Sequence, residues 1–187
     1  KYLGESEKNL RRAIEMAERL APIVLWIDEL EKVFGSSKGE DSGAAQRVLG
    51  SFLTWLQEKR DSVFVVATSN DVVGLPPELL RKGRFDEIFF VDLPGEQTRA
   101  EIFALHLRKR RREPSDFDLA QLAEQTPGFS GAELEQVVVA ALYRAFGDGT
   151  ELEQRHLQDE VAMTRPLSTT MAEPIAALRA WASTRTV

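Results

Sequence analysis

The sequence predicts an α/β fold, in which a parallel sheet flanked by helices is followed by an all-helical part. Short apolar runs rich in β-branched and aromatic residues alternate with amphipathic helical patterns as far as residue 94. Strands separated by helices favour a parallel, covered sheet. Beyond that point only helical patterns follow. We therefore expect two subdomains, residues 1–94 and 95–187.

The first subdomain begins with apolar residues at helical spacing over residues 6–20, and Pro22 ends that helix. The run IVLWI at 23–27 predicts a strand that is buried on both faces. The pattern then predicts an amphipathic helix over 48–56, a second strand over 62–70, a short helix with a turn over 76–87, and a third strand over 88–93.

The second subdomain carries helical patterns and no convincing strand. We expect helices at about 97–112, 118–125, 131–146, 151–163 and 172–184. Proline and glycine residues interrupt the pattern between them. The basic run LRKRRRE at 107–113 comes at the end of a predicted helix, where positive charge interacts favourably with the helix dipole.

The composition of the chain excludes several classes of function. The chain has 187 residues, of which 43% are apolar, so it can bury a sizeable core. A net charge of −6 argues against a dedicated nucleic-acid binder, and the absence of cysteine excludes disulfides and thiolate zinc sites. His106 and His156 have no partner cluster, so we expect no zinc site. There is no signal-peptide pattern or membrane span, so we expect a cytoplasmic protein, and the lack of an initiating Met predicts a longer parent chain.

Polar side chains follow two of the predicted strands. Asp28 and Glu29 come after the first strand, and Asn70 ends the second. Ligands of open parallel sheets lie beyond the carboxyl ends of the strands. A carboxylate there can hold Mg²⁺, its neighbour can polarise a water that attacks a phosphate, and the amide can orient that water. The alternative is that the two acids only end the strand and cap the following helix.

Linked motifs strengthen the first interpretation. VLWIDE, VFVVATSN, ELLRKGRFDEIFF and FSGAE occur in an order and spacing that resemble the AAA ATPases, P-loop machines that work as rings. Specific motifs extend to about residue 146, and beyond it only the helical character matches. The combination is most similar to the little-characterised AAA proteins of plastid and cyanobacterial genomes and their relatives in other bacteria.

The resemblance implies roles for five residues. Asp28 of the Walker B strand would organise Mg²⁺, Glu29 would activate the hydrolytic water, and Asn70 matches the sensor 1 position. Arg81 and Arg84 match the arginine fingers, which neutralise charge in a neighbouring subunit's ATP site. That match implies a homo-oligomeric ring, usually a hexamer in this family. In a monomer the two arginines would belong only to a solvated turn.

Two further matches to the family concern the binding of the polypeptide substrate and of the adenine base of ATP. Tyr2 and Leu3 resemble the pore loop that grips a substrate polypeptide through apolar contact, although Tyr2 could equally be a disordered terminal residue. In the lid, Ile102 and His106 would line the adenine pocket, while a lone His is more often a packing or surface residue.

Gly131 and Ala132 match the family's small-residue lid motif, which lets the helix approach the nucleotide closely. An N-cap at Ser130 is compatible with this match.

One element of the family is missing. No G-x-x-x-x-G-K followed by Ser or Thr occurs in the 187 residues, and in the family this P-loop and its strand precede the present segment. The missing strand would lie between those of residues 63–68 and 88–93, so the sheet would be incomplete with unpaired edges. We therefore expect an ATP- and Mg²⁺-dependent ATPase in the parent protein, remodelling another protein or complex, and an inactive isolated chain.

Two other functions stay open. The chain could be a non-catalytic, AAA-derived interaction module whose ATP site is a relic. It could also be a nucleic-acid motor if the arginines at 108–112 lined a channel, although a solvated helix face is the preferred interpretation of that run. No H-E-x-x-H occurs, which argues against the membrane-protease branch. The expected location is the cytoplasm, or the plastid stroma in a plastid-bearing source.

Overall fold

The computed structural model describes residues 3–34, 42–59, 61–81 and 83–186. They form two compact units, residues 1–88 and 89–187. The first contains a small parallel sheet with flanking helices, and the second is helical. The predicted fold class, a parallel α/β part followed by a helical part, is confirmed.

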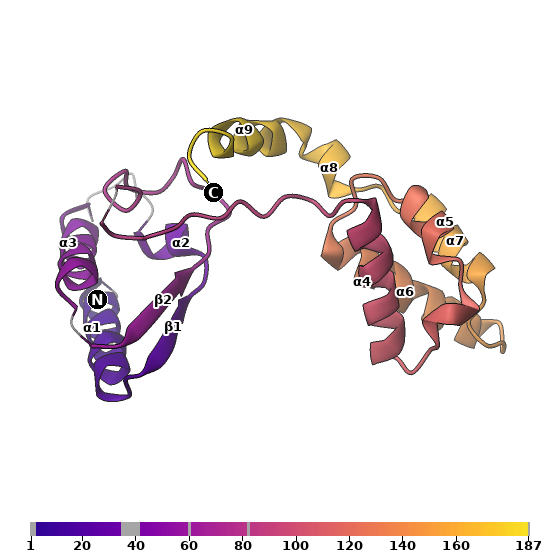
Figure 1. Cartoon of the computed structure of the whole chain (residues 1–187), viewed down its shortest axis with the longest axis horizontal. Helices are drawn as coiled ribbons and strands as arrows, with labels where there is room; N and C mark the ends of the chain where they lie inside the picture. The colour runs from indigo at the N-terminus through magenta and orange to yellow at the C-terminus, as the bar shows by residue number, and fades with distance from the viewer. Residues whose placement is uncertain (1–2, 35–41, 60, 82, 187) are drawn as a thin grey trace. The chain divides into compact units, whose positions relative to one another are not determined.

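In the α/β unit, two parallel strands are preceded and separated by helices (Figure 1). Their register runs from Ile23 opposite Val63 to Ile27 opposite Ala67. The elements are α1 (Leu3–Arg19), β1 (Ile23–Ile27), α2 (Leu30–Phe34), α3 (Ser42–Glu58) and β2 (Val63–Ala67).

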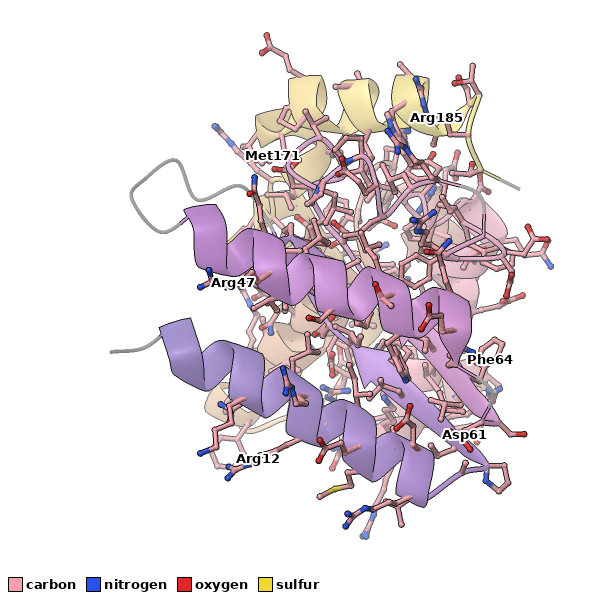
Figure 2. The ribbon with its side chains drawn as sticks, turned by 90° about the vertical axis from the view of Figure 1, so that its left-hand side faces the viewer. Arg12, Arg47, Asp61, Phe64, Met171 and Arg185 are labelled. Carbon is pink, nitrogen blue, oxygen red and sulfur yellow. The ribbon has the colours of Figure 1, made fainter. Side chains whose placement is uncertain are left out.

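Helices α1 and α3 lie side by side, and Figure 2 looks onto this pair, with Arg12 labelled on α1 and Arg47 on α3. Their apolar sides contribute to one core with the strands. Its buried members are Leu30, Phe34, Val48, Phe52, Leu53, Leu56, Leu75 and Leu79. The core leaves the carboxyl ends of both strands accessible, where the polar residues of interest follow.

The prediction that β1 is buried on both faces is wrong. Exposure alternates along the strand, and Val24 and Trp26 are 57% and 62% exposed. Phe64, which lies opposite Val24 in β2, is 67% exposed. A parallel sheet is covered on both faces only when helices pack on each side, and the described helices of this unit bury one face.

The predicted third strand over residues 88–93 does not form in the described structure. Strands β1 and β2 pair only with each other, and residues 88–95 carry no strand. An apolar β-branched run is not enough for a strand, because the ladder also needs a neighbour that supplies hydrogen bonds.

The prediction of a short helix within residues 76–87 is also wrong. Residues 77–80 form a turn, with the Leu79 N–H donating to the Pro76 carbonyl at 3.0 Å and the Leu80 N–H to the Pro77 carbonyl at 3.2 Å. Such bonds span three residues and do not continue into an α-helix.

The helical unit contains all five helices that the sequence predicts, with bounds that differ by a few residues. They are α4 (Glu96–Lys109), α5 (Leu119–Glu124), α6 (Gly131–Gly147), α7 (Gln154–Met163) and α9 (Ala172–Ala182). The short helices α2 and α8 (Leu167–Thr170) and a 3₁₀ turn at Pro114–Asp116 were not predicted. Among the described residues, no helix combines the length and apolarity needed to cross a bilayer.

Helix α4 contacts both α5 and α6, and α6 contacts α7, so these four helices enclose one core (Figure 1). Its residues are Phe103, Leu107, Leu122, Phe129, Leu134, Val137, Val138, Ala141, Ala145, Leu152, Leu157 and Val161. Helix α6 starts with a capping box: Ser130 Oγ accepts the Glu133 N–H at 3.3 Å, and the Glu133 carboxylate accepts the Ser130 N–H at 2.7 Å. The N-cap at Ser130 is therefore confirmed.

Candidate functional site

The carboxyl ends of β1 and β2 bring together residues that are about forty positions apart in the sequence. Because the strands are parallel and in register, Thr68 lies next to Asp28, directly after the strand pair ends at Ile27 and Ala67. The Thr68 N–H donates to the Ile27 carbonyl at 3.0 Å, and the Leu30 N–H donates to the Thr68 carbonyl at 2.8 Å. The backbone ladder thus extends into the loop that carries Asp28 and Glu29.

The Thr68 hydroxyl joins both acidic positions. It donates to Asp28 Oδ1 and accepts the backbone N–H of Glu29 at 3.1 Å. A hydroxyl has one proton and two lone pairs, so it can make both bonds at once. The Asp28 side chain is therefore oriented by Thr68 while the residue stays exposed to solvent. An oriented, accessible carboxylate suits a metal ion or a metal-bound water.

Glu29 has an unusual backbone. Its φ is 51°, in the left-handed region, where a residue with a side chain costs about 1–2 kcal/mol. Residues in such sparsely populated conformations cluster at active sites, although Arg111, just after α4, has a similar φ of 57°. The Glu29 carboxylate accepts a hydrogen bond from Lys32 Nζ at 2.6 Å. This hydrogen bond, together with the negative charge of Glu29, raises the pKa of Lys32.

Asn70 meets Glu31 at the same end of the sheet. The Asn70 N–H donates to Glu31 Oε1 at 3.2 Å, and the Asn70 residue is exposed. Burial raises the pKa of the Glu31 carboxyl, but the nearby Ser69 hydroxyl, the backbone N–H groups of Glu31 and Asn70, and the charge of Lys32 together lower it by more. Glu31 therefore stays ionised and anchors the backbone from which the Asn70 amide projects.

Arg81 and Arg84 lie in the turn that follows Leu80. Arg81 is exposed, and Gly83, with a φ of 87°, makes the turn between the two arginines. Arg84 is half-buried, and its Nε has no hydrogen-bond partner among the described residues. In the described part of the chain, neither guanidinium forms an ion pair with Asp28 or Glu29, so this unit alone does not bring the four residues together.

In the helical unit, Ile102 of α4 and Gly131 of α6 are neighbours. A Cβ added to Gly131 would lie 3.8 Å from Ile102 Cδ1, which is an ordinary van der Waals distance. Packing inside the unit therefore does not require glycine at position 131. Ala132, the next residue, is exposed.

His106 is one turn of α4 beyond Ile102 and is only 8% exposed. Its Nδ1 lies 3.2 Å from Glu135 Oε1 and 3.3 Å from Arg110 Nη1. The hydrogen bond from Arg110, followed by the charge of His106, lowers the pKa of Glu135 against a smaller opposing effect of burial. His106 is thus part of a packed polar cluster between α4 and α6.

The basic run at residues 107–113, at the end of α4, is partly neutralised within the chain. Arg110 Nη2 lies 2.8 Å from Glu135 Oε1, and Arg112 Nη1 lies 2.5 Å from Glu151 Oε2. These two cations tie the end of α4 to Glu135 of α6 and to the loop between α6 and α7. Arg110 and Arg112 therefore form ion pairs within the chain, in addition to their favourable interaction with the helix dipole.

The structure does not describe the side chains of the two pore-loop candidates, Tyr2 and Leu3. Tyr2 lies outside the described residues. Leu3 is the first residue of α1, and its side chain also lies outside what is described.

Asp28 fits one ligand position of a magnesium ion. In phosphate-binding proteins Mg²⁺ commonly takes one or two carboxylates, several waters and the substrate phosphates. Asp28 offers an oriented, exposed carboxylate of this kind. In the described part of the chain, no three His, Cys, Asp or Glu side chains gather into a metal-binding group. A magnesium ion at Asp28 would therefore depend on waters and phosphate oxygens.

The residues that organise the site were missed from the sequence. Thr68 follows β2 as Asp28 follows β1, and aligning the two strand ends would have indicated that they meet. Lys32 is three residues after Glu29, a spacing at which helical side chains meet. Glu31 gives no local signal, because its partner is Asn70 on the other strand end.

Comparison with known proteins agrees with these features. Residues 1–93 match the family described as ATPase family associated with various cellular activities (AAA), and residues 116–159 match the AAA+ lid domain.

The chain is also 45% identical over 183 residues to the Uncharacterized AAA domain-containing protein ycf46 of Guillardia theta, a match that covers 97% of this chain and 36% of the relative. It is 44% identical over 182 residues to the protein of the same name from Pyropia yezoensis, covering 96% and 37%. The chain thus spans little more than a third of the length of these relatives. With an α/β unit followed by a helical lid, it belongs to the AAA family.

Proposed function

We propose that this chain is the hydrolytic and lid portion of a longer protein that hydrolyses ATP and uses the energy to remodel a protein or a protein complex. Membership of the AAA family supports ATPase chemistry. The observation that carries the proposal is the hydrogen bonding of Thr68, which links the Asp28 carboxylate to the Glu29 backbone where two strands end. Such strand ends are where open parallel sheets bind ligands.

The residues divide the chemistry between them. Mg²⁺ bound with ATP neutralises phosphate charge and orders the reacting oxygens. Asp28 orients that ion or one of its waters. Glu29 accepts the proton of the attacking water, which requires its carboxylate to leave Lys32. The Asn70 amide orients the same water. Asp28 and Glu29 therefore have different tasks although they are adjacent.

We further propose that Arg81 and Arg84 act in a neighbouring subunit of a homo-oligomeric ring, most simply a hexamer. Supporting this, Arg81 is exposed and the Nε of Arg84 has no partner among the described residues. A guanidinium that approaches the γ-phosphate neutralises charge that develops as the phosphoryl group is transferred. Tyr2 and Leu3 would grip the substrate polypeptide by apolar contact.

The lid residues Ile102, His106, Gly131 and Ala132 form the base side of the proposed site. Packing within the helical unit leaves room for a side chain at position 131, so the presence of glycine there is better explained by the close approach of a bound nucleotide. Filling that space with Gly131→Val should weaken nucleotide binding more than it changes the stability of the helical unit.

Phosphate binding needs a contribution from outside the 187 residues. The backbone amides and lysine of a P-loop hold the β- and γ-phosphates, and no such motif occurs in the chain. We propose that the longer protein supplies it, that the isolated chain does not turn over ATP, and that the protein works in the cytoplasm or the plastid stroma.

A second candidate is a non-catalytic interaction module derived from the AAA fold. The exposed apolar face of β1 and β2, with Val24, Trp26 and Phe64, favours it, since uncovered faces of this kind often bind partners. The ATPase proposal is preferred because the Thr68 hydroxyl orients the Asp28 carboxylate at the strand ends, which an interaction module does not need.

The test compares ATP hydrolysis by the 187-residue chain with hydrolysis by the longer protein that includes a P-loop. Each is measured with and without Glu29→Gln. Turnover by the longer protein alone, abolished by the substitution, is the expected result. If the longer protein is inactive, the interaction module becomes the better account. If the short chain is active and depends on Glu29, the proposed phosphate site is wrong.

A further inference from the structure

The C-terminal clasp, which we define as α8 and α9 with residues 167–182, is attached to the helical unit at its beginning. The Leu167 N–H donates to Glu133 Oε1 at 2.6 Å. Ser168 lies against Gly128, where an added Cβ would overlap the Ser168 hydroxyl and where φ is 78°. Glycine is therefore favoured at position 128 by the backbone conformation, and it lets Ser168 of α8 pack closely.

A second attachment holds α9. Arg179 reaches Asp92, 87 residues earlier in the chain, with Nε 2.9 Å from Oδ2 and Nη2 2.8 Å from Oδ1. This forked geometry is the strong form of an arginine–carboxylate pair. The hydrogen bond from Arg179 lowers the pKa of Asp92 against a smaller effect of burial, and the same bond raises the pKa of Arg179. Both side chains are about half exposed, so the pair can open and close.

A pocket of about 170 Å³ lies between the clasp and residues 90–94. Ile175 and Leu178 of α9 form one wall, Ser130 and Gly131 at the start of α6 form another, and residues 90–94 complete it. Helix α9 is the yellow helix between the labelled Met171 and Arg185 in Figure 2. Residues 90–94 have no strand partner among the described residues, and their described contacts include the Asp92–Arg179 pair with α9, the pocket walls at Ser130 and Gly131, and a hydrogen bond from Arg99 Nη1 of α4 to the Pro94 carbonyl at 3.0 Å.

We propose that the clasp is a positioning device for the nucleotide site, in which the Asp92–Arg179 pair holds α9 and residues 90–94 together beside Gly131. This inference rests on the proposed function, because it takes the Gly131 side of the helical unit as the base side of the ATP site. When the Asp92–Arg179 pair is formed, the clasp is closed, the pocket beside Gly131 keeps all its walls, and the protein binds ATP. When the pair breaks, Ile175 and Leu178 move away from residues 90–94, and the affinity for ATP falls. Asp92 and Arg179 thus set binding and do not take part in hydrolysis.

The first measurement uses the chain as it is. Hydrogen exchange of the α9 amides is followed in wild type, in Arg179→Asp, and in the double variant Asp92→Arg with Arg179→Asp. The single change places two carboxylates together, so exchange should rise by about fivefold or more, and the double variant should restore it. Arg155→Ala, which breaks the exposed ion pair with Glu153 in α7, is the matched control and should leave α9 unchanged. Unchanged exchange in Arg179→Asp would overturn the clasp.

The second measurement uses the longer protein. ATP affinity is measured in a Glu29→Gln background, in which the proposed hydrolysis is blocked, with and without Arg179→Asp. If Arg179→Asp leaves the clasp closed a third of the time, the affinity for ATP should fall about threefold. In the protein that keeps Glu29, the same substitution should change kcat by no more than about twofold. The double variant should recover affinity. If α9 opens and ATP affinity does not change, the inference is wrong and the proposed function stands. If ATP does not bind even with an intact clasp, the proposed function itself is wrong.

Discussion

The helical unit encloses its apolar side chains, whereas the α/β unit has a buried core on one face of its sheet and leaves the other face exposed. In the helical unit, Phe103, Leu107 and Leu134 are fully buried by helices from the same hundred residues. In the α/β unit, Trp26 and Phe64 point away from the core and are more than 60% exposed. Both units contain similar apolar residues, so the difference lies in what surrounds them.

The comparison shows how differently helices and parallel strands depend on the rest of a protein. A helix satisfies its backbone hydrogen bonds internally and needs only one neighbour for its apolar side. A parallel strand needs a partner strand for its backbone hydrogen bonds, and parallel sheets usually have a layer on each face. The α/β unit has two strands with one covered face, so a further layer would stabilise it more than it would stabilise the helical unit.

The largest effect is expected for Phe103→Ala. Phe103 has no exposed surface and packs in the centre of the helical core, so truncation should cost about 3–5 kcal/mol of unfolding free energy. Denaturant unfolding followed by circular dichroism measures it. A loss below about 1 kcal/mol would mean that the helical unit does not have the tight core described here.

A smaller loss is expected for Ser130→Ala at the start of α6. It removes the hydroxyl of the capping box, which typically costs about 0.5–2 kcal/mol. The same unfolding experiment applies, and Ser115→Ala, at an exposed position before α5, is the control. Equal stability of the two variants would contradict a stabilising cap at Ser130.

Acid should weaken the same helix end. Burial raises the pKa of Glu133, but hydrogen bonds from the backbone of Ser130 and Leu167 and from the Ser130 hydroxyl lower it by more, to below its ordinary value of 4.5. The unfolded state then binds more protons, so this stability is present above about pH 4.5 and is lost as pH falls through the folded pKa. Unfolding free energies between pH 7 and pH 3 should depend less on pH in Glu133→Gln. An unchanged pH dependence would be inconsistent with this role.

The smallest effect on stability is expected for Phe64→Ala, the matched partner of the Phe103 change. Because Phe64 is 67% exposed, the cost should be about 1 kcal/mol or less. The substitution should also reduce self-association, because it removes part of the exposed apolar face. Unfolding and sedimentation velocity test both points. A cost comparable to that of Phe103→Ala would show that the sheet face is covered in solution.

The same contrast explains what could be predicted from the sequence. Helices such as α4 and α6 followed from apolar spacing, because helical burial repeats every three to four residues along one segment. The segment 88–93 has a strand-like composition but no described partner, and the exposed face of β1 depends on layers that local pattern does not report. A strand-like composition therefore gives a strand only where a pairing partner is available.

For the candidate site, the strand pattern placed Asp28, Glu29 and Asn70 at strand ends. It could not reveal the Thr68 hydroxyl bridge or the bond from the Asn70 N–H to Glu31, since each joins residues about forty positions apart. Likewise, the Asp92–Arg179 pair spans 87 positions and has no local signal. Chemistry-bearing residue types can be found in one segment, whereas the residues that orient them usually lie in another.

The most direct test of the account is the ATP hydrolysis rate of the longer protein with Thr68→Val and with Thr68→Ser. Valine keeps the shape of threonine and removes the hydroxyl that orients Asp28 and the Glu29 backbone, whereas serine keeps the hydroxyl. We expect the rate of Thr68→Ser to stay within about threefold of wild type and that of Thr68→Val to fall about 10²-fold, the cost of misplacing catalytic groups by about 1 Å. Equal rates for the two variants would contradict a hydrolytic site built on the Thr68 bridge.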